Sequence, residues 1–120
     1  MPNLIMEYSD ALEGRLNIHS MLQDMHQIMI DSDLFECNSI RSRTLRTHLW
    51  LIGESEDQHN FIHISIELIE GRTPEQKKAL SDRIFQLLVE QANWVGSLSV
   101  DVRDMDQECF NRRCNTNLTK

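Results

Sequence analysis

The chain has 120 residues, the usual size of one domain with a single hydrophobic core. A hydrophobic share of 40% and a charged share of 26%, with only 4 Gly and 2 Pro, are typical of a folded globular protein and exclude the disordered and fibrous classes. Lys and Arg number 12 against 19 Asp and Glu, so the net charge is −7, the wrong sign for a general binder of nucleic acid. An acidic protein can still bind a small anion where a few arginines converge.

The cysteines and the start of the chain favour a cytoplasmic protein. Cys37, Cys109 and Cys114 are odd in number and form no dense disulfide framework, which fits a reducing compartment. The first fifteen residues hold several acids and only Arg15 as a base, unlike the basic start and apolar stretch of a secretion signal. No run approaches the roughly 18 apolar residues of a membrane span. We therefore expect no membrane partner.

The first half of the chain predicts a strand, a helix and a second strand. Residues 3–8 are mostly apolar and precede the turn-forming pair Ser9-Asp10, which is typical of a strand. Asn17 has the side chain of a helix N-cap. After it, apolar residues fall on one helical face, namely Ile18, Met21, Leu22, Met25, Ile28 and Met29. A polar stretch follows, and alternation over residues 42–51 predicts the second strand.

The second half repeats this order. Residues 61–68 show the clearest alternation in the chain, with Ile62, Ile64, Ile66 and Leu68 on one side. The sequence Thr73-Pro74-Glu75-Gln76 then predicts a helix start, because Thr caps, Pro suits the first helical position and Gln completes a capping box. This helix is expected to reach about Trp94. A last strand is predicted around Leu98, Val100 and Val102.

Two successive strand, helix, strand segments predict an α+β fold, in which two tandem βαβ units form a four-stranded sheet with two helices on one face. We expect one domain over residues 1–120, with pseudo-repeats at about 2–56 and 60–106 and a C-terminal tail at 107–120. The repeated order points to an internal duplication. Two helices cover only one sheet face, so the other face meets solvent or, as we expect, another copy of the chain.

Pro2 directly follows Met1, and an initiator methionine is generally removed before so small a residue. Its removal leaves a free prolyl amine. Burial and neighbouring cations disfavour the charged form of such an amine and lower its pKa toward neutrality, where a general base works best. Pro2 is therefore a candidate base, although a proline that merely opens a strand is the simpler interpretation of its position alone.

Four arginines flank the predicted strands. Arg41, Arg43 and Arg46 open the second strand, and Arg72 lies where the third strand meets the second helix. Arginine suits bidentate binding of a carboxylate, and the free amides of the helix start beside Arg72 also favour an anion. The alternative is a set of solvated charges at strand ends.

The histidines and cysteines lack metal-site spacing within their expected elements. The two histidine pairs considered as metal ligands are His19 with His26 and His59 with His63. Cys109 and Cys114 have no second cysteine pair or nearby histidine to complete four ligands. We expect no metal and no phosphate-binding Gly-rich loop.

The segment from Ile62 to Lys77, which ends Glu70-Gly71-Arg72-Thr73-Pro74-Glu75-Gln76-Lys77, resembles the strand, Gly-Arg turn and helix of tautomerase-superfamily subunits. The opening Met1-Pro2-Asn3-Leu4-Ile5 fits the same superfamily. The chain length and the segments Ile40-Arg41-Ser42-Arg43 and Phe61-Ile62-His63 resemble its long-subunit branch, the 5-carboxymethyl-2-hydroxymuconate delta-isomerases. The resemblance covers about residues 2–106.

This resemblance implies that Pro2 is the general base, that Arg41 and Arg72 bind substrate carboxylates and polarise the 2-hydroxy or 2-oxo end, and that Arg43 adds a substrate contact. It also implies a cofactor-free homotrimer that converts 5-carboxymethyl-2-hydroxymuconate, a small anion, to its 2-oxo-3-ene isomer during homoprotocatechuate breakdown. Short-subunit relatives begin each βαβ unit with a catalytic proline. The second unit here opens with Phe61, so one prolyl amine per chain is implied.

Two alternatives stay open. Relatives with the same prolyl amine tautomerise keto acids, hydrate or dehalogenate acrylates, or decarboxylate a semialdehyde, so the fold alone does not determine the reaction. The chain could also be a non-catalytic trimer that binds small anions. Measuring which members of a substrate panel are turned over distinguishes the isomerase from the other reactions of the superfamily. Anion binding that survives Pro2→Ala, with no turnover of any panel member, would identify the non-catalytic trimer.

Overall fold

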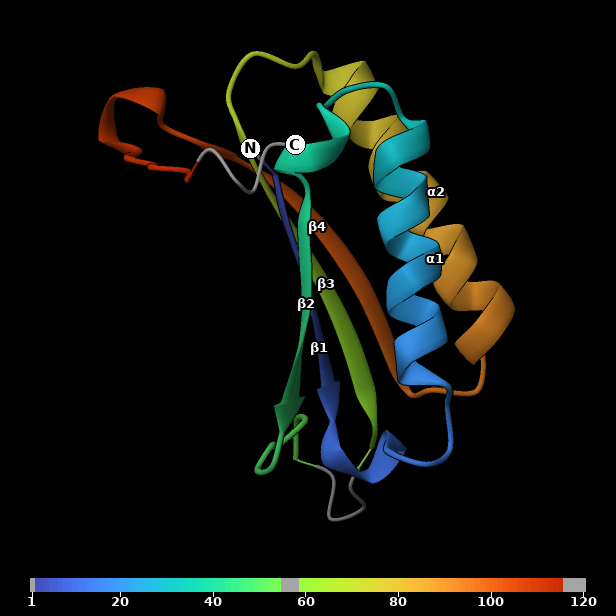
Figure 1. Ribbon diagram of the computed structural model, residues 1–120. Coiled ribbons are helices and arrows are strands. Elements are labelled where there is room, and N and C mark those ends of the chain that lie inside the picture. Colours follow the sequence, from blue (N-terminus) through green and yellow to red (C-terminus); the bar gives the residue numbers. More distant parts are fainter. Residues whose placement is uncertain (1, 55–58, 116–120) are drawn as a thin grey trace.

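The computed structural model describes residues 2–54 and 59–115. It confirms the predicted order of elements, whose bounds are β1 Asn3–Ser9, α1 Ile18–Asp31, β2 Arg41–Thr47, β3 Phe61–Ile69, α2 Pro74–Ala92 and β4 Ser97–Met105. Three single-turn 3-10 helices are Asp10–Leu12, Cys37–Ser39 and Gln107–Cys109. Both long helices lie on one face of the sheet, as predicted (Figure 1). Met1, part of the predicted turn before β3 and the last five residues of the predicted tail lie outside the described residues.

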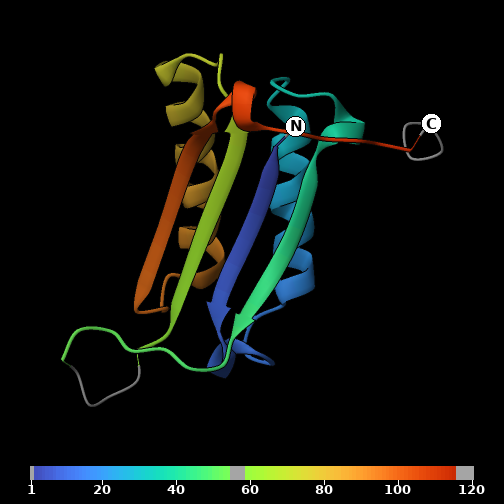
Figure 2. The ribbon, with the colours of Figure 1, turned by 90° about the vertical axis from the view of Figure 1, so that its left-hand side faces the viewer.

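The four strands follow the order β2-β1-β3-β4. β1 pairs with β2 in parallel, β3 pairs with β4 in parallel, and the two βαβ units meet through the antiparallel pair of β1 and β3. Asn3 lies opposite both Arg41 and Glu67, so β1 and β2 begin at the end of the sheet where β3 terminates. Figure 2 shows the strands in front of the two long helices, so these helices leave the other sheet face open, and the chain after β4 crosses in front of its upper end. The structure thus has the predicted repeat order, while the duplication itself stays a prediction.

The core lies between the sheet and the helices. Even-numbered positions of β1 and β3 point into it, and α1 contributes the methionine stripe expected from its spacing. The side chains at or near zero exposure include Leu4, Met6, Met21, Met25, Met29, Ile62, Ile64, Ile66, Leu68, Ile84 and Leu88. Among the described residues, no helix is both long and apolar enough to cross a bilayer.

Both predicted helix starts are confirmed by their capping contacts. The side chain of Asn17 accepts a hydrogen bond from the Ser20 N–H at 3.0 Å. The hydroxyl of Thr73 accepts from the Gln76 N–H at 3.1 Å, and the Gln76 side chain accepts from the Thr73 N–H at 2.9 Å. These bonds satisfy backbone donors that a helix start otherwise leaves free.

The second strand is shorter than predicted. Alternation in the sequence runs to Leu51, but β2 ends at Thr47. Thr47 pairs with Ser9, the last residue of β1, so the residues beyond it have no partner strand. Leu49 and Leu51 are instead 82% and 94% exposed. Alternation shows which residues share a face, but hydrogen-bond pairing decides where a strand stops.

Candidate active site

One end of the sheet gathers the predicted site residues, because β1 and β2 begin there and β3 ends there (Figure 1). Pro2 is buried directly before β1. Its carbonyl oxygen accepts the backbone N–H of Arg41 at 3.1 Å. The parallel pairing of β1 and β2 therefore places Pro2 beside the start of β2 and its arginines.

Arg41 and Arg43 are two positions apart in β2, so both side chains lie on the open face of the sheet. Both are exposed. Within residues 2–54 and 59–115, neither makes a hydrogen bond or an ion pair through its side chain. Two neighbouring guanidinium groups without a carboxylate partner form a local positive charge on an acidic protein, and this is the condition under which a small anion binds.

Arg72 follows the turn after β3, where Gly71 has a φ of +131° that favours glycine. Its Nη1 donates to the carbonyl oxygen of Ile69 at 3.1 Å, and its Nη2 donates to that of Leu34 at 2.7 Å. The guanidinium carbon lies 4.9 Å from the ring centroid of Phe35. Arg72 is thus anchored at the same end of the sheet, but by neutral groups and from the helix side.

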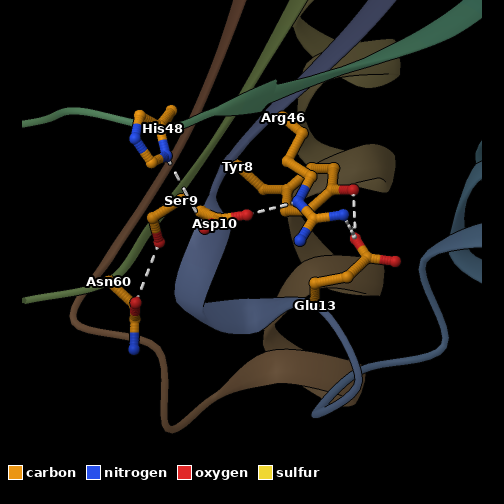
Figure 3. A network of polar contacts seen from close by, with 7 residues as sticks. All are labelled: Tyr8, Ser9, Asp10, Glu13, Arg46, His48 and Asn60. Carbon is orange, nitrogen blue, oxygen red and sulfur yellow. Dashed lines mark hydrogen bonds and ion pairs between the residues drawn. The ribbon is translucent and has the colours of Figure 1, made fainter.

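Arg46 does not belong with the other arginines, contrary to the interpretation from sequence. It faces the helix side near the opposite end of β2, where its Nε forms an ion pair with Asp10 (Figure 3). Glu13 lies 4.0 Å from its Nη1. The hydrogen bond to Asp10 raises the pKa of Arg46. Arg46 lies on the opposite face of β2 from Arg41 and Arg43, and farther along the strand.

The contacts around Arg46 belong to a polar network at the far end of β1, which was not predicted. The hydroxyl of Tyr8 donates to the carboxylate of Glu13, and burial together with this bond raises the pKa of Tyr8 to about 12. Ser9, fully buried, donates from Oγ to Asn60 at 2.9 Å and accepts the Phe61 N–H at 3.1 Å. These groups are mutually satisfied, so the network ties β1 to its neighbours (Figure 3).

Two of the histidines lie beside serine hydroxyl groups. His26 Nδ1 lies 2.7 Å from the hydroxyl of Ser42, and His63 Nδ1 lies 2.6 Å from that of Ser99. Across residues 2–54 and 59–115, no three His, Cys, Asp or Glu side chains gather as metal ligands would.

Two adjoining cavities of about 320 and 460 Å³ lie between α1 and α2. Ile28, Asp31 and Arg83 line both of them. Neither cavity is lined by Pro2 or by the arginines beside it. The predicted site residues therefore lie outside this interhelical groove.

Comparison with known proteins agrees with the fold. Residues 2–116 match the 5-carboxymethyl-2-hydroxymuconate isomerase family. The chain belongs to this family. It is thus a member of an isomerase family within the tautomerase superfamily, whose reactions use no cofactor.

Individual relatives show how distant the similarity is. The 5-carboxymethyl-2-hydroxymuconate Delta-isomerase of Escherichia coli is 20% identical over 88 residues, which are 73% of this chain and 70% of that protein. The crystal structure of a 5-carboxymethyl-2-hydroxymuconate isomerase from Deinococcus radiodurans has a TM-score of 0.86 and 26% identity, over 95% of this chain and 90% of that one. A fused 4-OT wild-type symmetric trimer has a TM-score of 0.72 and 18% identity, over 88% of each chain. These similarities confirm the tautomerase-like fold.

Proposed function

We propose that this family member isomerises 5-carboxymethyl-2-hydroxymuconate or a similar unsaturated 2-hydroxy polycarboxylate to its 2-oxo-3-ene form. In this proposal the amine of Pro2, after removal of Met1, is the general base. Arg41 stabilises developing negative charge at the 2-oxygen, and Arg72 and Arg43 bind substrate carboxylates. The match of residues 2–116 to the isomerase family supports the reaction class.

One observation carries the assignment of residues. Pro2 is buried beside the start of β2, with its carbonyl bonded to the N–H of Arg41, while Arg41 and Arg43 have no carboxylate partner among the described residues. The proposed base and two arginines without a carboxylate partner therefore lie at the same sheet end, which supports the proposal. A dicarboxylate or tricarboxylate dienol matches this arrangement in charge.

The proposed reaction moves one proton and leaves the atom count unchanged. The prolyl nitrogen takes the proton of the 2-hydroxyl group, the electron pair shifts through the conjugated diene, and the nitrogen returns the proton to the distant carbon. The 2-oxo group and the 3-ene result. Guanidinium groups lower the barrier because negative charge builds on oxygen during the transfer, and fixed cations stabilise it there.

We further propose that the protein works as a homotrimer in the cytoplasm, in the breakdown of homoprotocatechuate. The open face of the sheet supports self-association, since neither long helix covers it and the chain after β4 crosses only its upper end (Figure 2). It carries the half-exposed Leu45 next to Arg43. The fused 4-OT relative is a symmetric trimer with the same fold.

The test starts with the intact mass of untagged protein and of Pro2→Ala. Both residues are small enough for removal of methionine, so the two proteins are matched except for the prolyl amine. The same samples are then assayed by ultraviolet absorbance with 2-hydroxymuconate, phenylenolpyruvate and 3-chloroacrylate. We expect Met1 to be absent from both proteins and the dienols to be ketonised by wild type only.

Arg41→Ala extends this experiment. We expect its kcat to fall about ten- to a hundredfold, more than its KM rises, because the charge it meets develops mainly in the transition state. Arg83→Ala, an exposed arginine between the helices, is the matched control. Retained Met1, or turnover that ignores Pro2, would overturn the proposed base. Anion binding without turnover of the panel would instead favour a non-catalytic trimer.

A further inference from the structure

The guanidinium of Arg72 is held from three sides by neutral groups. Two carbonyl oxygens, from Leu34 and Ile69, accept its hydrogen bonds, and the ring of Phe35 lies 4.9 Å from its central carbon. By contrast, Arg46 and Arg103 are paired with the carboxylates of Asp10 and Asp101. Arg72 is therefore fixed in place without having its charge neutralised by a carboxylate.

The anchored side chain keeps donors for a ligand. A guanidinium has five N–H groups, and the two carbonyl bonds of Arg72 use two of them. The guanidinium of Arg72 lies over the ring of Phe35. Arginine stacks on aromatic rings through the face of its guanidinium, so the N–H groups at the edge of the guanidinium stay available. The remaining N–H groups can still take a carboxylate.

Phe35 and the Leu34 carbonyl come from one short turn at the end of α1. The hydroxyl of Ser32 donates to the Met29 carbonyl at 2.7 Å and accepts the Leu34 N–H at 3.3 Å. Asp33 adopts a positive φ of 59° within this turn, a conformation that Asp tolerates better than most residues. The turn is thus held by its own hydrogen bonds, and Phe35 packs against the core.

We propose that Phe35 is a positioning residue for Arg72. Its ring sets the orientation in which the free N–H groups of Arg72 bind a substrate carboxylate. The inference rests on the proposed function, because it concerns substrate binding at the same sheet end. It adds a residue that lies 37 positions away from Arg72 in the chain and takes no part in the proton transfer.

The test compares Phe35→Leu with Phe35→Tyr, using a dienol that wild type turns over. Leu keeps apolar volume but removes the aromatic face, whereas Tyr retains it. We expect KM to rise about 2- to 30-fold in Phe35→Leu, the range of a cation–π contact, with a smaller change in kcat and with recovery in Phe35→Tyr. Phe85→Leu, a partly exposed phenylalanine of α2, is the matched control and should leave both constants unchanged.

A double-mutant cycle shows whether Phe35 acts through Arg72. In the Arg72→Ala background, Phe35→Leu should leave KM unchanged, because the guanidinium that it orients is gone. An equal rise of KM in both backgrounds, or an unchanged KM in Phe35→Leu alone, would overturn the inference. If Phe35→Leu does not fold, Phe35→Met replaces it, and failure of both to fold would assign Phe35 to the core instead.

The two proposals fail in different ways. The proposed function is wrong if wild type does not turn over the dienol, or if turnover does not depend on Pro2. The inference on Phe35 alone is wrong if wild type and Pro2→Ala behave as expected but the Phe35 variants do not.

Discussion

Tyr8 is the single tyrosine of the chain, so its ionisation can be followed without interference from another phenol. Burial and its hydrogen bond to Glu13 raise its pKa from the ordinary 10.0 to about 12. We expect the phenolate absorbance of the folded protein to appear with a midpoint near pH 12, and that of the protein in urea near pH 10. Equal midpoints would contradict a buried, bonded hydroxyl.

The same shift makes stability depend on pH. Because the folded state holds the proton more tightly, the stabilisation is complete below pH 10 and is lost as the pH rises toward 12. Two pKa units correspond to a loss of about 3 kcal/mol in the free energy of unfolding. Urea denaturation at several pH values should show this extra loss in wild type and not in Tyr8→Phe, which lacks the titrating hydroxyl.

At the scale of an element, the capping contacts at the start of α2 have a consequence for stability. Thr73→Ala removes the hydroxyl that accepts the Gln76 N–H, and loss of such a cap costs about 1 kcal/mol of unfolding free energy. Thr73→Ser keeps the acceptor and is the control. Thermal and urea denaturation of the three proteins measure the difference. An undiminished stability of Thr73→Ala would mean that the cap is replaceable.

The elements differ in how well the sequence predicts them. The strand β3 and the start of α2 follow local signals, namely alternation and the four residues of the capping box, so prediction and structure agree. The end of β2 depends on where β1 stops, and nothing within β2 itself contains that information. The sequence places Arg46 in the same strand as Arg41 but does not show that Asp10 lies beside it in the fold. This is why the sequence alone groups the two arginines.

In the candidate site, too, some residues can be predicted from the sequence and others cannot. Pro2 and Arg41 were predicted from their positions at strand starts and from family resemblance, and the parallel pairing of β1 and β2 places them together. The contact of Phe35 with Arg72 is not predicted from the sequence, because a lone aromatic residue in a polar stretch has no periodic pattern. Only the fold brings it to Arg72.

For the whole molecule, the open sheet face is the place to test assembly. Leu45 lies on that face and is 50% exposed, so Leu45→Glu should leave each chain folded while placing a desolvated charge in any interface. We expect wild type near 42 kDa, about three times the chain mass of 14.1 kDa, and Leu45→Glu at a smaller mass. Light scattering after gel filtration measures both.

Val89→Glu, at a 42% exposed position of α2, is the matched control and should keep the larger mass. A wild-type protein at the mass of one chain would contradict the proposed trimer. A Leu45→Glu protein at the wild-type mass would place the interface elsewhere.

The two βαβ units repeat one backbone contact, in which the residue before the first strand accepts an N–H from the start of the parallel partner. Pro2 accepts from Arg41, and Asn60 accepts from Ser97, both at 3.1 Å. Asn60, and not Phe61 as expected from the sequence, thus occupies the position of Pro2, but its nitrogen is a peptide nitrogen whose lone pair is delocalised into a carbonyl. If the amine of Pro2 is the base, an assembly holds one catalytic centre for every two units. Covalent labelling by a substrate-like inactivator directed to the catalytic amine should therefore saturate at one equivalent per chain, on Pro2.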